Sequence, residues 1–555
     1  LSVETTALIS AREVYTDGSS SGTITHSYIF PLDAMQAPEL NSGIVNDAVY
    51  GPIIEETLHA LPTVSLVAAD TLSTTEQEAS VEWIDPDGEE AHIRCGARDV
   101  GGHSLNYDKN NIRLNFRSAY GAGKLTLDLF ADFATGVPPA DTHDALNLRS
   151  GSHDSVLYLG TAGQYARNRW MDESQLEMGH IAPHGRYAHL YVDGSYTGLY
   201  HVRERFDAGL LAEYLGGDED DYEAVNGGSA VDGSGAAWSA IVAASSDFEA
   251  FSELVDVDNY LDYMILNFYA GNDWDWNPSQ NWMAAGPALG GSGAGRYIFH
   301  ASDNDICLYY SADINILHEV GPSYTFDNLK RESHPDFWAR FADRAALLLH
   351  GVLAPDAAAD RYTAITAQIE DAVVAESARW GAGNWERDVD WDEERRRLLE
   401  EYFPARTDIL LQQFRDAGWY SLDRPEVSHP AGVIAGDLTV SVPAAHSAQL
   451  LLTLDGTDPR LPGGDASDAA EVHEGSAALT LQQSAMLSAR LYQPESGVWG
   501  PLLTGLYEVD APSAMVLNEW NAVAADATLR DDGEDTTLGR AEGNGGDWIE
   551  LLVIE

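Results

Sequence analysis

The stretch GNDWDWNPSQNW, residues 271–282, sets acidic and carboxamide side chains among three tryptophans. Its carboxylates are Asp273 and Asp275, and its carboxamides include Asn277 and Asn281. Oxygen atoms of this kind are the ligands that hard cations take in proteins. The Asn-Pro dipeptide, which follows a helical pattern, indicates an irregular loop. We therefore expect a loop that holds a cation or a polar ligand. The alternative is a cap-and-turn cluster packed by the indole rings.

A second acidic pair follows an apolar strand pattern. GRYIFHA, residues 295–301, is typical of a strand, and Asp303 and Asp305 come directly after it. The end of a strand can present a carboxylate to a metal ion. Two acids at this spacing after a strand are also common turn residues. The residues alone leave both interpretations open.

The elements that must position these side chains change in kind along the chain. Strand patterns dominate residues 60–205, and helical patterns follow over residues 206–420. Strands followed by helices are typical of an α+β protein, and we expect two lobes. The Asp-Gly pair at 193–194, between alternating runs, predicts a tight hairpin. Residues 251–271 and 392–418 carry apolar side chains at helical spacing, and the second pattern is broken near its proline.

Both ends of the chain are predicted to hold β modules. Residues 1–27 contain two short β runs, and two strands are not stable alone. We expect the end of a β-sandwich there, followed by a linker over residues 28–59. Residues 421–510 alternate short strands with Gly, Pro and Asp turns, as in a separate β-sandwich. Residues 511–555 are predicted to form two strands around an acidic, glycine-rich loop, and we expect the chain to be an internal piece of a longer protein.

The charge of the chain narrows the classes of partner. It has 31 Lys and Arg against 89 Asp and Glu in 555 residues, a formal net charge of −58. Without a basic stripe to displace phosphate counterions, nucleic acid is a poor partner. An evenly acidic surface fits a secreted, extracellular or cell-surface protein, or a calcium binder. The longest apolar run, residues 263–270, is too short for the roughly 20 residues that span a bilayer, so we expect no membrane insertion.

The two cysteines, Cys95 and Cys307, are too few for a disulfide scaffold and do not match a zinc pattern. One bridge between them or two free thiols are equally compatible with the sequence. In an oxidising compartment a bridge would be plausible.

Five motifs follow one another along the chain, namely GHSLNYDKNNIRLNFRSAYGAGKL (102–125), LNLRSGSHDS (146–155), HGRYAHLYVDGSYTGLYHVRERFD (184–207), GNDWDWNPSQNW (271–282) and IFHASDND (298–305). In this order they resemble the motifs of the CotH kinase-like family, which has an atypical protein-kinase-like fold. The resemblance extends over about residues 60–420. Residues 1–27 and 421–510 resemble chitobiase C-terminal-like modules, and residues 511–555 resemble the start of a lamin-tail-like domain.

The resemblance implies roles for the acidic motifs in phosphoryl transfer, which depends mainly on positioning and charge. It implies a metal-binding aspartate at Asp303, with Asp305 beside it. By analogy with the catalytic loops of ordinary kinases, Asp273 or Asp275 is the candidate catalytic carboxylate and Asn281 the second metal ligand. The spacing of Asp and Asn is longer here than in those loops, so either the loop is longer or Asn277 takes the second role.

The resemblance also implies roles for basic and acidic residues of the strand-rich part. Glu204 matches the glutamate of the family motif Tyr-x-Gly-x-Tyr-x-x-x-Glu, and it is predicted to orient a lysine or support the metal. The alternative is an exposed acid paired with a neighbouring arginine. Family members commonly have two adjacent lysines where this chain has Lys109 and Asn110. Lys109 is the candidate phosphate-binding residue, and Arg113 or Arg149 could replace it, although arginine and lysine are not interchangeable.

Three functions are compatible with these observations. The first is a secreted kinase-like enzyme that uses Mg²⁺ or Mn²⁺ with ATP, with Ca²⁺ as a further candidate, to phosphorylate Ser or Thr of a surface or matrix protein. The second is a catalytically degenerate scaffold that acts as an extracellular structural or adhesive protein and can self-assemble. The third is a carbohydrate-active protein in which Glu204 and Asp273 or Asp275 form a carboxylate pair between tryptophan platforms.

Overall fold

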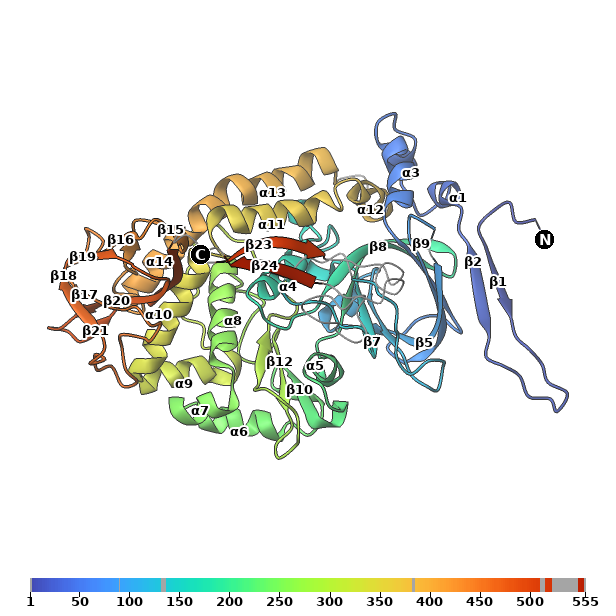
Figure 1. The fold of residues 1–555 in the computed structure, drawn as a ribbon. Helices are drawn as coiled ribbons and strands as arrows, with labels where there is room; N and C mark the ends of the chain where they lie inside the picture. The colour runs from blue at the N-terminus through green and yellow to red at the C-terminus, as the bar shows by residue number, and fades with distance from the viewer. Residues whose placement is uncertain are drawn as a thin grey trace. The chain divides into compact units, whose positions relative to one another are not determined.

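The computed structural model of the chain is a mixed α+β structure with several sheets (Figure 1). The chain divides into two compact units, residues 1–420 and 421–555. Within the part of the chain that the structure describes, no helix combines the length and the apolar character needed to cross a membrane. The residues described are 2–88, 90–130, 136–381, 385–509, 515–521 and 548–553.

Seven described strands of the first unit close into a barrel, in the order β3-β4-β5-β6-β7-β9-β8. All neighbours are antiparallel except β3 and β8, whose parallel pairing closes the barrel. Inward-facing side chains such as Leu66, Cys95 and Leu148 are wholly buried in one apolar core. The strands are β3 (Thr63–Ala68), β4 (Gln77–Ile84), β5 (Glu90–Val100), β6 (Asn111–Asn115), β7 (Ala145–Arg149), β8 (Gly185–Val192) and β9 (Ser195–Glu204).

The hairpin predicted at the Asp-Gly pair is confirmed as the turn between β8 and β9. Asp193 has φ of 48° and Gly194 has φ of 80°. Positive φ at both central residues is the geometry whose twist matches that of the paired strands. The local sequence was therefore sufficient to specify this element.

The rest of the first unit is mostly helical, and its main core surrounds α8 (Val257–Ala270). Nearly every side chain of α8 is buried, because other helices and a sheet cover it on all sides. The single pattern predicted over 251–271 is in fact two helices, because Asp256 caps α8 by accepting a hydrogen bond from the Asn259 amide. The other helices of this part are α4 (Arg167–Glu177), α5 (Ala208–Leu215), α6 (Ala236–Ala244), α7 (Phe248–Leu254), α9 (Thr325–Glu332), α10 (Pro335–Leu349), α11 (Pro355–Ala367) and α12 (Ala372–Trp380).

The helical pattern over 392–418 forms α13 (Asp392–Arg397) and α14 (Phe403–Asp416), joined by a π-helical turn at Leu398–Tyr402. The predicted interruption near Pro404 is therefore confirmed, and the proline lies in the first turn of α14. Proline is tolerated there because the first amides of a helix have no partner within it.

A four-stranded sheet also lies within the residues predicted as helical. Its order is β11-β10-β12-β13, with β10 (Tyr222–Asn226), β11 (Ser229–Asp232), β12 (Met283–Pro287) and β13 (Ile298–His300). Residues 271–282 run from the end of α8 to the start of β12 without helix or strand. The irregular loop predicted there is confirmed, as is the strand before Asp303.

The segment predicted as a linker over 28–59 instead holds three helices, α1 (Pro31–Met35), α2 (Ser42–Val45) and α3 (Tyr50–Ala60). Their apolar side chains, including Ile54 and Leu58, pack in one cluster with residues of α12. The partner helix lies more than 300 residues away in the sequence, so the polar local sequence did not indicate that these residues pack as helices. Before them, the two β runs of residues 1–27 pair as a hairpin of β1 (Ala7–Ala11) and β2 (Ile24–Tyr28).

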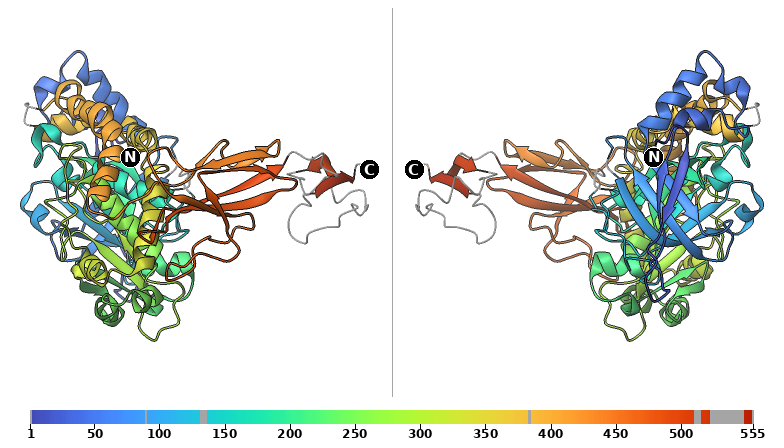
Figure 2. Two further views of the ribbon diagram at one scale, coloured as in Figure 1. Left: turned by 90° about the vertical axis from the view of Figure 1, so that its left-hand side faces the viewer. Right: turned by 90° about the vertical axis from the view of Figure 1, so that its right-hand side faces the viewer.

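The second unit contains two sheets around a core of its own, which includes Leu438, Leu450 and Leu487. Two more strands, β23 (Met515–Asn521) and β24 (Trp548–Val553), pair with each other, and Figure 2 gives two further views of the chain. The acidic, glycine-rich loop predicted between them lies outside the described residues. The remaining strands are β14 (Glu426–Val427), β15 (Gly432–Ile434), β16 (Asp437–Ser441), β17 (Gln449–Thr453), β18 (Glu471–Glu474), β19 (Ser476–Thr480), β20 (Ala485–Gln493), β21 (Val498–Trp499) and β22 (Leu503–Val509).

The two cysteines are separate thiols. Cys95 is buried in the barrel and Cys307 in the core around α8, and neither forms a disulfide. Burial raises the pKa of Cys95 to about 12. Of the two possibilities that the sequence left open, the structure has free thiols.

Candidate active site

A cleft of about 700 Å³ opens within the first unit. One side comes from β6, β7 and the end of β9, and the other from the loop at 271–282 and the residues after β13. Six of the residues predicted from the sequence line it, namely Arg113, Arg149, Asp275, Asn281, Asp303 and Asp305. The fold thus brings together side chains from segments that are up to about 190 residues apart.

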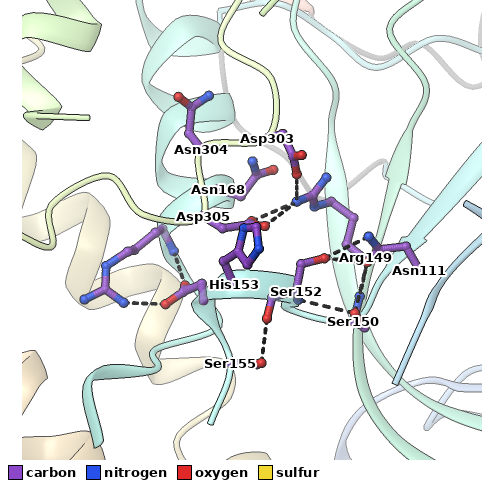
Figure 3. A network of polar contacts seen from close by, with 12 residues as sticks. Asn111, Arg149, Ser150, Ser152, His153, Ser155, Asn168, Asp303, Asn304 and Asp305 are labelled. Carbon is purple, nitrogen blue, oxygen red and sulfur yellow. Dashed lines mark hydrogen bonds and ion pairs between the residues drawn. The ribbon is translucent and has the colours of Figure 1, made fainter. Parts of the chain in front are cut away.

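Arg149 joins the two acids that follow β13. Its Nη2 donates to Asp303 Oδ1 at 2.6 Å and to Asp305 Oδ1 and Oδ2 at 2.8 and 2.9 Å, as Figure 3 shows. Burial opposes ionisation of Asp303, but the guanidinium of Arg149 outweighs it and lowers the pKa of that carboxyl. Asp305 is more deeply buried, and burial raises its pKa to about 7. One arginine therefore serves two carboxylates, and the local balance remains negative.

Asp275 is the carboxylate least well compensated in this cleft. Its side chain is 10% exposed, and Oδ2 has no hydrogen-bond partner. The nearest ionisable nitrogen, His153 Nδ1, is 4.0 Å away. Burial, followed by repulsion from Asp303 and Asp305, raises the pKa of Asp275 to about 8. A buried carboxylate oxygen without a hydrogen bond is costly, so this position favours an added cation.

Two of the cleft residues have strained backbones. Asp303 has φ of 59° and Asn281 has φ of 61°, in the left-handed region that non-glycine residues seldom adopt. Asn281 Nδ2 donates to the backbone oxygen of Asp275 at 2.8 Å, which ties the two halves of the loop together. Strain of this kind is held only where surrounding structure enforces it, and it clusters at functional sites.

A buried polar network fixes the turn that follows Arg149. Asn111 Oδ1 accepts hydrogen bonds from Ser150 N at 2.8 Å and from the hydroxyls of Ser150 and Ser152 at 3.0 Å (Figure 3). These residues lie in the motifs quoted above, but we did not predict a role for them. Their hydroxyl and amide groups are too common in turns to be recognised as site residues before the contacts are known.

Arg113, Arg149, Arg203 and Arg205 line the barrel side of the cleft. Arg113 donates through Nε to Asn147 Oδ1 at 3.1 Å, a neutral partner. Burial, and then the nearby charges of Arg205 and Arg98, lower the pKa of Arg113 to about 10. Like charges held together at reduced solvation favour an anion, and arginine is well suited to phosphate.

Aromatic rings form one wall of the cleft. His153 and Tyr158 are 4.3 Å apart between ring centroids, and Tyr158 and Trp274 are 6.2 Å apart at an interplanar angle of 32°. The indole of Trp274 remains 57% exposed. An exposed ring at the mouth of a charged cleft can stack on a planar ligand.

Lys109 lies away from the cleft, although sequence analysis made it the candidate phosphate-binding residue. It is 2% exposed, and its Nζ donates to Glu376 Oε1 at 2.6 Å and to the Leu199 carbonyl at 2.7 Å. Gly198 of the family motif makes room for this pair, since a Cβ there would lie 2.5 Å from Glu376 Oε2. The lysine therefore joins the barrel to α12, and its charge is already matched.

Glu204 and Asp273 also lie outside the cleft lining. Glu204 is wholly buried and accepts hydrogen bonds from His184 N at 2.8 Å and Ala140 N at 3.1 Å. It is neither exposed nor paired with a neighbouring arginine. Asp273 is on the surface, with Oδ1 3.5 Å from His318 Nε2. Because Glu204 does not line the cleft, it does not form the carboxylate pair with Asp273 or Asp275 that a carbohydrate-active site would need.

The other predicted residues of the cleft carry the donor type that a hard divalent cation takes. Asp275, Asp303, Asp305 and Asn281 offer oxygen donors on one cleft, and Asp275 Oδ2 is a buried oxygen without a partner. Mg²⁺ and Mn²⁺ prefer oxygen donors, and Mg²⁺ is usually held by one or two carboxylates plus the phosphates of its substrate. The donor set therefore suits a metal that arrives with a phosphate ligand.

The fold and the site define a mixed α+β protein whose cleft is lined by both acids and arginines. Residues 101–247 match the family model described as CotH kinase protein, so the chain carries a CotH kinase family domain over these residues. That match includes Arg113 and Arg149, whereas Asp275, Asp303 and Asp305 follow it in the sequence. A comparison with curated proteins found no match.

Proposed function

We propose that this chain is a CotH-type kinase that uses ATP and Mg²⁺ or Mn²⁺ to phosphorylate Ser or Thr of a surface or matrix protein outside the cell. The observation that carries the proposal is the buried carboxylate of Asp275, whose Oδ2 has no hydrogen-bond partner and which shares a cleft with Asp303 and Asp305 opposite Arg113. Kinase family membership over residues 101–247 suggests the same class of chemistry.

Most side chains of the cleft would bind the metal ion or ATP, and one would take part in the reaction. Asp303, Asp305 and Asn281 would hold the metal ion, which supplies charge neutralisation on the phosphate oxygens when bound. Arg149 keeps the two carboxylates in place, and Arg113 lies where phosphate oxygens can be bound. The rings of Tyr158 and Trp274 offer a face for the nucleobase.

Asp275 is the candidate base. The acceptor hydroxyl oxygen bonds to the γ-phosphorus, the bond from that phosphorus to the leaving ADP oxygen breaks, and the hydroxyl proton passes to Asp275. A raised pKa suits this role only where the group is ionised before attack. A nearby cation favours the ionised form of Asp275. The metal ion that binds the phosphates would therefore also keep the base deprotonated.

A scaffold function is the second candidate, and a specific observation favours it. Lys109 is engaged by Glu376 in the interior, so the lysine that ordinary kinases turn toward phosphate does not line this cleft. In that case the cleft would bind a ligand weakly or not at all, and the flanking β modules would carry the structural or adhesive function.

Thermal unfolding with ligand separates the two candidates. The full chain should unfold at a higher temperature with ATP and Mn²⁺ together than with either alone, because ligand at 100 times its dissociation constant stabilises by about 2.7 kcal/mol. Asp303→Ala should lose the shift. Asp408→Ala, which removes an exposed acid of α14, should keep it.

Transfer of phosphate from labelled ATP to the chain itself or to casein-like acceptors then tests the reaction. If ATP raised the unfolding temperature of the wild type but no phosphate were transferred, the chain would bind nucleotide and the kinase proposal would be wrong. No shift at millimolar ATP, with all variants folded, would favour the scaffold.

A further inference from the structure

Three potential metal ligands meet on the outer face of the barrel, away from the cleft. His26 comes from β2, Glu82 from β4 and His92 from β5. Glu82 and His92 are direct partners in the register of β4 and β5. The hairpin of β1 and β2 lies beside the barrel (Figure 1). Its strand β2 contacts β4, and this contact brings His26 to the pair. None of the three lines the cleft described above.

The distances suit a small transition-metal ion. His92 Nδ1 is 2.8 Å and His26 Nδ1 is 3.7 Å from the same oxygen, Glu82 Oε1. The two imidazole rings have centroids 4.1 Å apart. Ligand bonds of about 2.0–2.2 Å in a tetrahedral zinc site place neighbouring donor atoms about 3.3 Å apart. The observed separations lie on either side of this value, so small side-chain rotations would complete the geometry.

The surroundings of Glu82 hold its carboxylate in a position suited to binding a metal ion. Glu82 is 3% exposed, whereas both histidines are exposed at the surface. Its second oxygen, Oε2, accepts a hydrogen bond from Ser27 N at 2.5 Å. A ligand oxygen fixed by a hydrogen bond to its other atom is typical of metal centres. A buried carboxylate with two exposed imidazoles above it leaves an open path for an ion.

The donor types select among metals. Two imidazole nitrogens and one carboxylate oxygen suit Zn²⁺, and three protein ligands leave a fourth position for water. All-oxygen sites are preferred by Mg²⁺ and Ca²⁺ instead. We propose that His26, Glu82 and His92 form a zinc site that fastens the β1–β2 hairpin to the barrel. This inference is independent of the proposed kinase function.

The consequence of such a site lies in the hairpin. A two-stranded hairpin is marginal in water, and among the described residues its polar contacts with the barrel include Ser65 Oγ to Ser27 Oγ at 2.8 Å. A metal bound to His26 and to both barrel ligands would link β2 to β4 and β5 directly. Zinc would then control how firmly the N-terminal hairpin is held.

Co²⁺ titration of the metal-free full chain tests the site, because tetrahedral Co²⁺ absorbs visible light strongly and replaces Zn²⁺. The wild type should show this absorption, and Zn²⁺ should abolish it by displacement. His26→Ala, His92→Ala and Glu82→Gln should each weaken binding by more than about 10-fold, since even loss of a supporting residue costs 10–100-fold. His59→Ala, an exposed histidine of α3, should leave binding unchanged.

A second cluster of potential metal ligands consists of Asp273, His318 and Glu319. A variant of this cluster shows which of the two clusters binds the Co²⁺ ion. Its histidine is 64% exposed, and His318→Ala should also leave the Co²⁺ spectrum unchanged. Loss of the spectrum in His318→Ala with retention in His26→Ala would overturn the proposal, as would the absence of any tetrahedral Co²⁺ signal.

Hydrogen exchange of the hairpin tests the fastening. Amides of residues 7–28 should exchange at least several-fold more slowly with Zn²⁺ than without it in the wild type. The same amides should show no zinc effect in His26→Ala, whose substituted side chain is exposed and whose folding is checked by its thermal transition. Tight zinc binding without any change in hairpin exchange would overturn the fastening role.

Discussion

At the scale of single residues, the cleft gathers charge that the chain alone does not compensate. Asp303 and Asp305 contact one guanidinium, that of Arg149, and Asp275 lies in the same cleft without contacting it. Close acids that cannot all ionise are common at sites built for a cation or for proton transfer. A cation bound here would offset this cost, because it favours the ionised form of the acids.

Asp275→Asn should stabilise the metal-free protein at alkaline pH. Burial and the two neighbouring acids raise the pKa of Asp275 from 3.8 to about 8. The folded state therefore keeps a proton that the unfolded chain loses above pH 4, and stability falls as the pH rises toward 8. We expect the variant to gain about 1–3 kcal/mol at pH 8 and to converge with the wild type near pH 4.

Urea unfolding of both proteins in EDTA across that pH range measures the effect. The same variant should lose its phosphoryl transfer, because Asp275 is the candidate base. An unchanged pH dependence in Asp275→Asn would show that this carboxyl is ionised at neutral pH without a cation, and would remove the main support for the metal site.

At the scale of elements, strand ends and loops deliver the site while helices and the barrel hold it. Asp303 follows β13, Arg149 ends β7, and Asp275 lies in the loop after α8. The Lys109–Glu376 pair couples the barrel to α12. It is an architectural contact in this chain, because its two charges are within 2.6 Å and wholly buried.

Lys109→Met should therefore destabilise the fold without changing affinity for ATP. Removing one member of a buried ion pair leaves the other uncompensated, at a cost of about 3–5 kcal/mol. Lys330→Met, at a half-buried lysine of α9, serves as the matched variant with a small expected cost. Chemical unfolding and ATP titration of the folded variants measure the two effects separately.

A loss of ATP affinity above 10-fold in folded Lys109→Met, or about 1.4 kcal/mol, would contradict the architectural assignment. It would mean that the lysine leaves Glu376 and reaches phosphate when nucleotide binds.

At the scale of the whole molecule, two compact units have separate apolar cores. Proteins with separate cores need not unfold in one step. Calorimetry of the full chain should show two transitions, and ATP with Mn²⁺ should raise only the one that belongs to residues 1–420. Because the net charge is −58, calorimetry should be done at 0.15 M salt, where repulsion between charges more than about 8 Å apart is largely screened.

Assignment of the transitions follows from Asp303→Ala, which should abolish the ligand shift and leave the other transition in place. If both transitions moved together with ligand, the two units would be energetically coupled, and the independence proposed here would be wrong.

Local sequence determined the features whose physics is local. Asp193 and Gly194 specify their turn because few residues tolerate positive φ, and Asn-Pro within 271–282 precludes a regular helix there. The position of Asp303 after a strand followed from the apolar run before it. The resemblance to a kinase-like family, drawn from the order of motifs, is supported over residues 101–247.

Only the tertiary structure decided which candidate side chains share a site. Lys109 and Glu376 are 267 residues apart, and nothing near either residue indicates that they form a buried pair. The same holds for the helices of residues 28–59, which pack against α12, and for Glu204, which turns inward to His184. Spacing in a sequence reports which face of an element a side chain occupies, whereas contact and burial depend on what the rest of the chain places against that face.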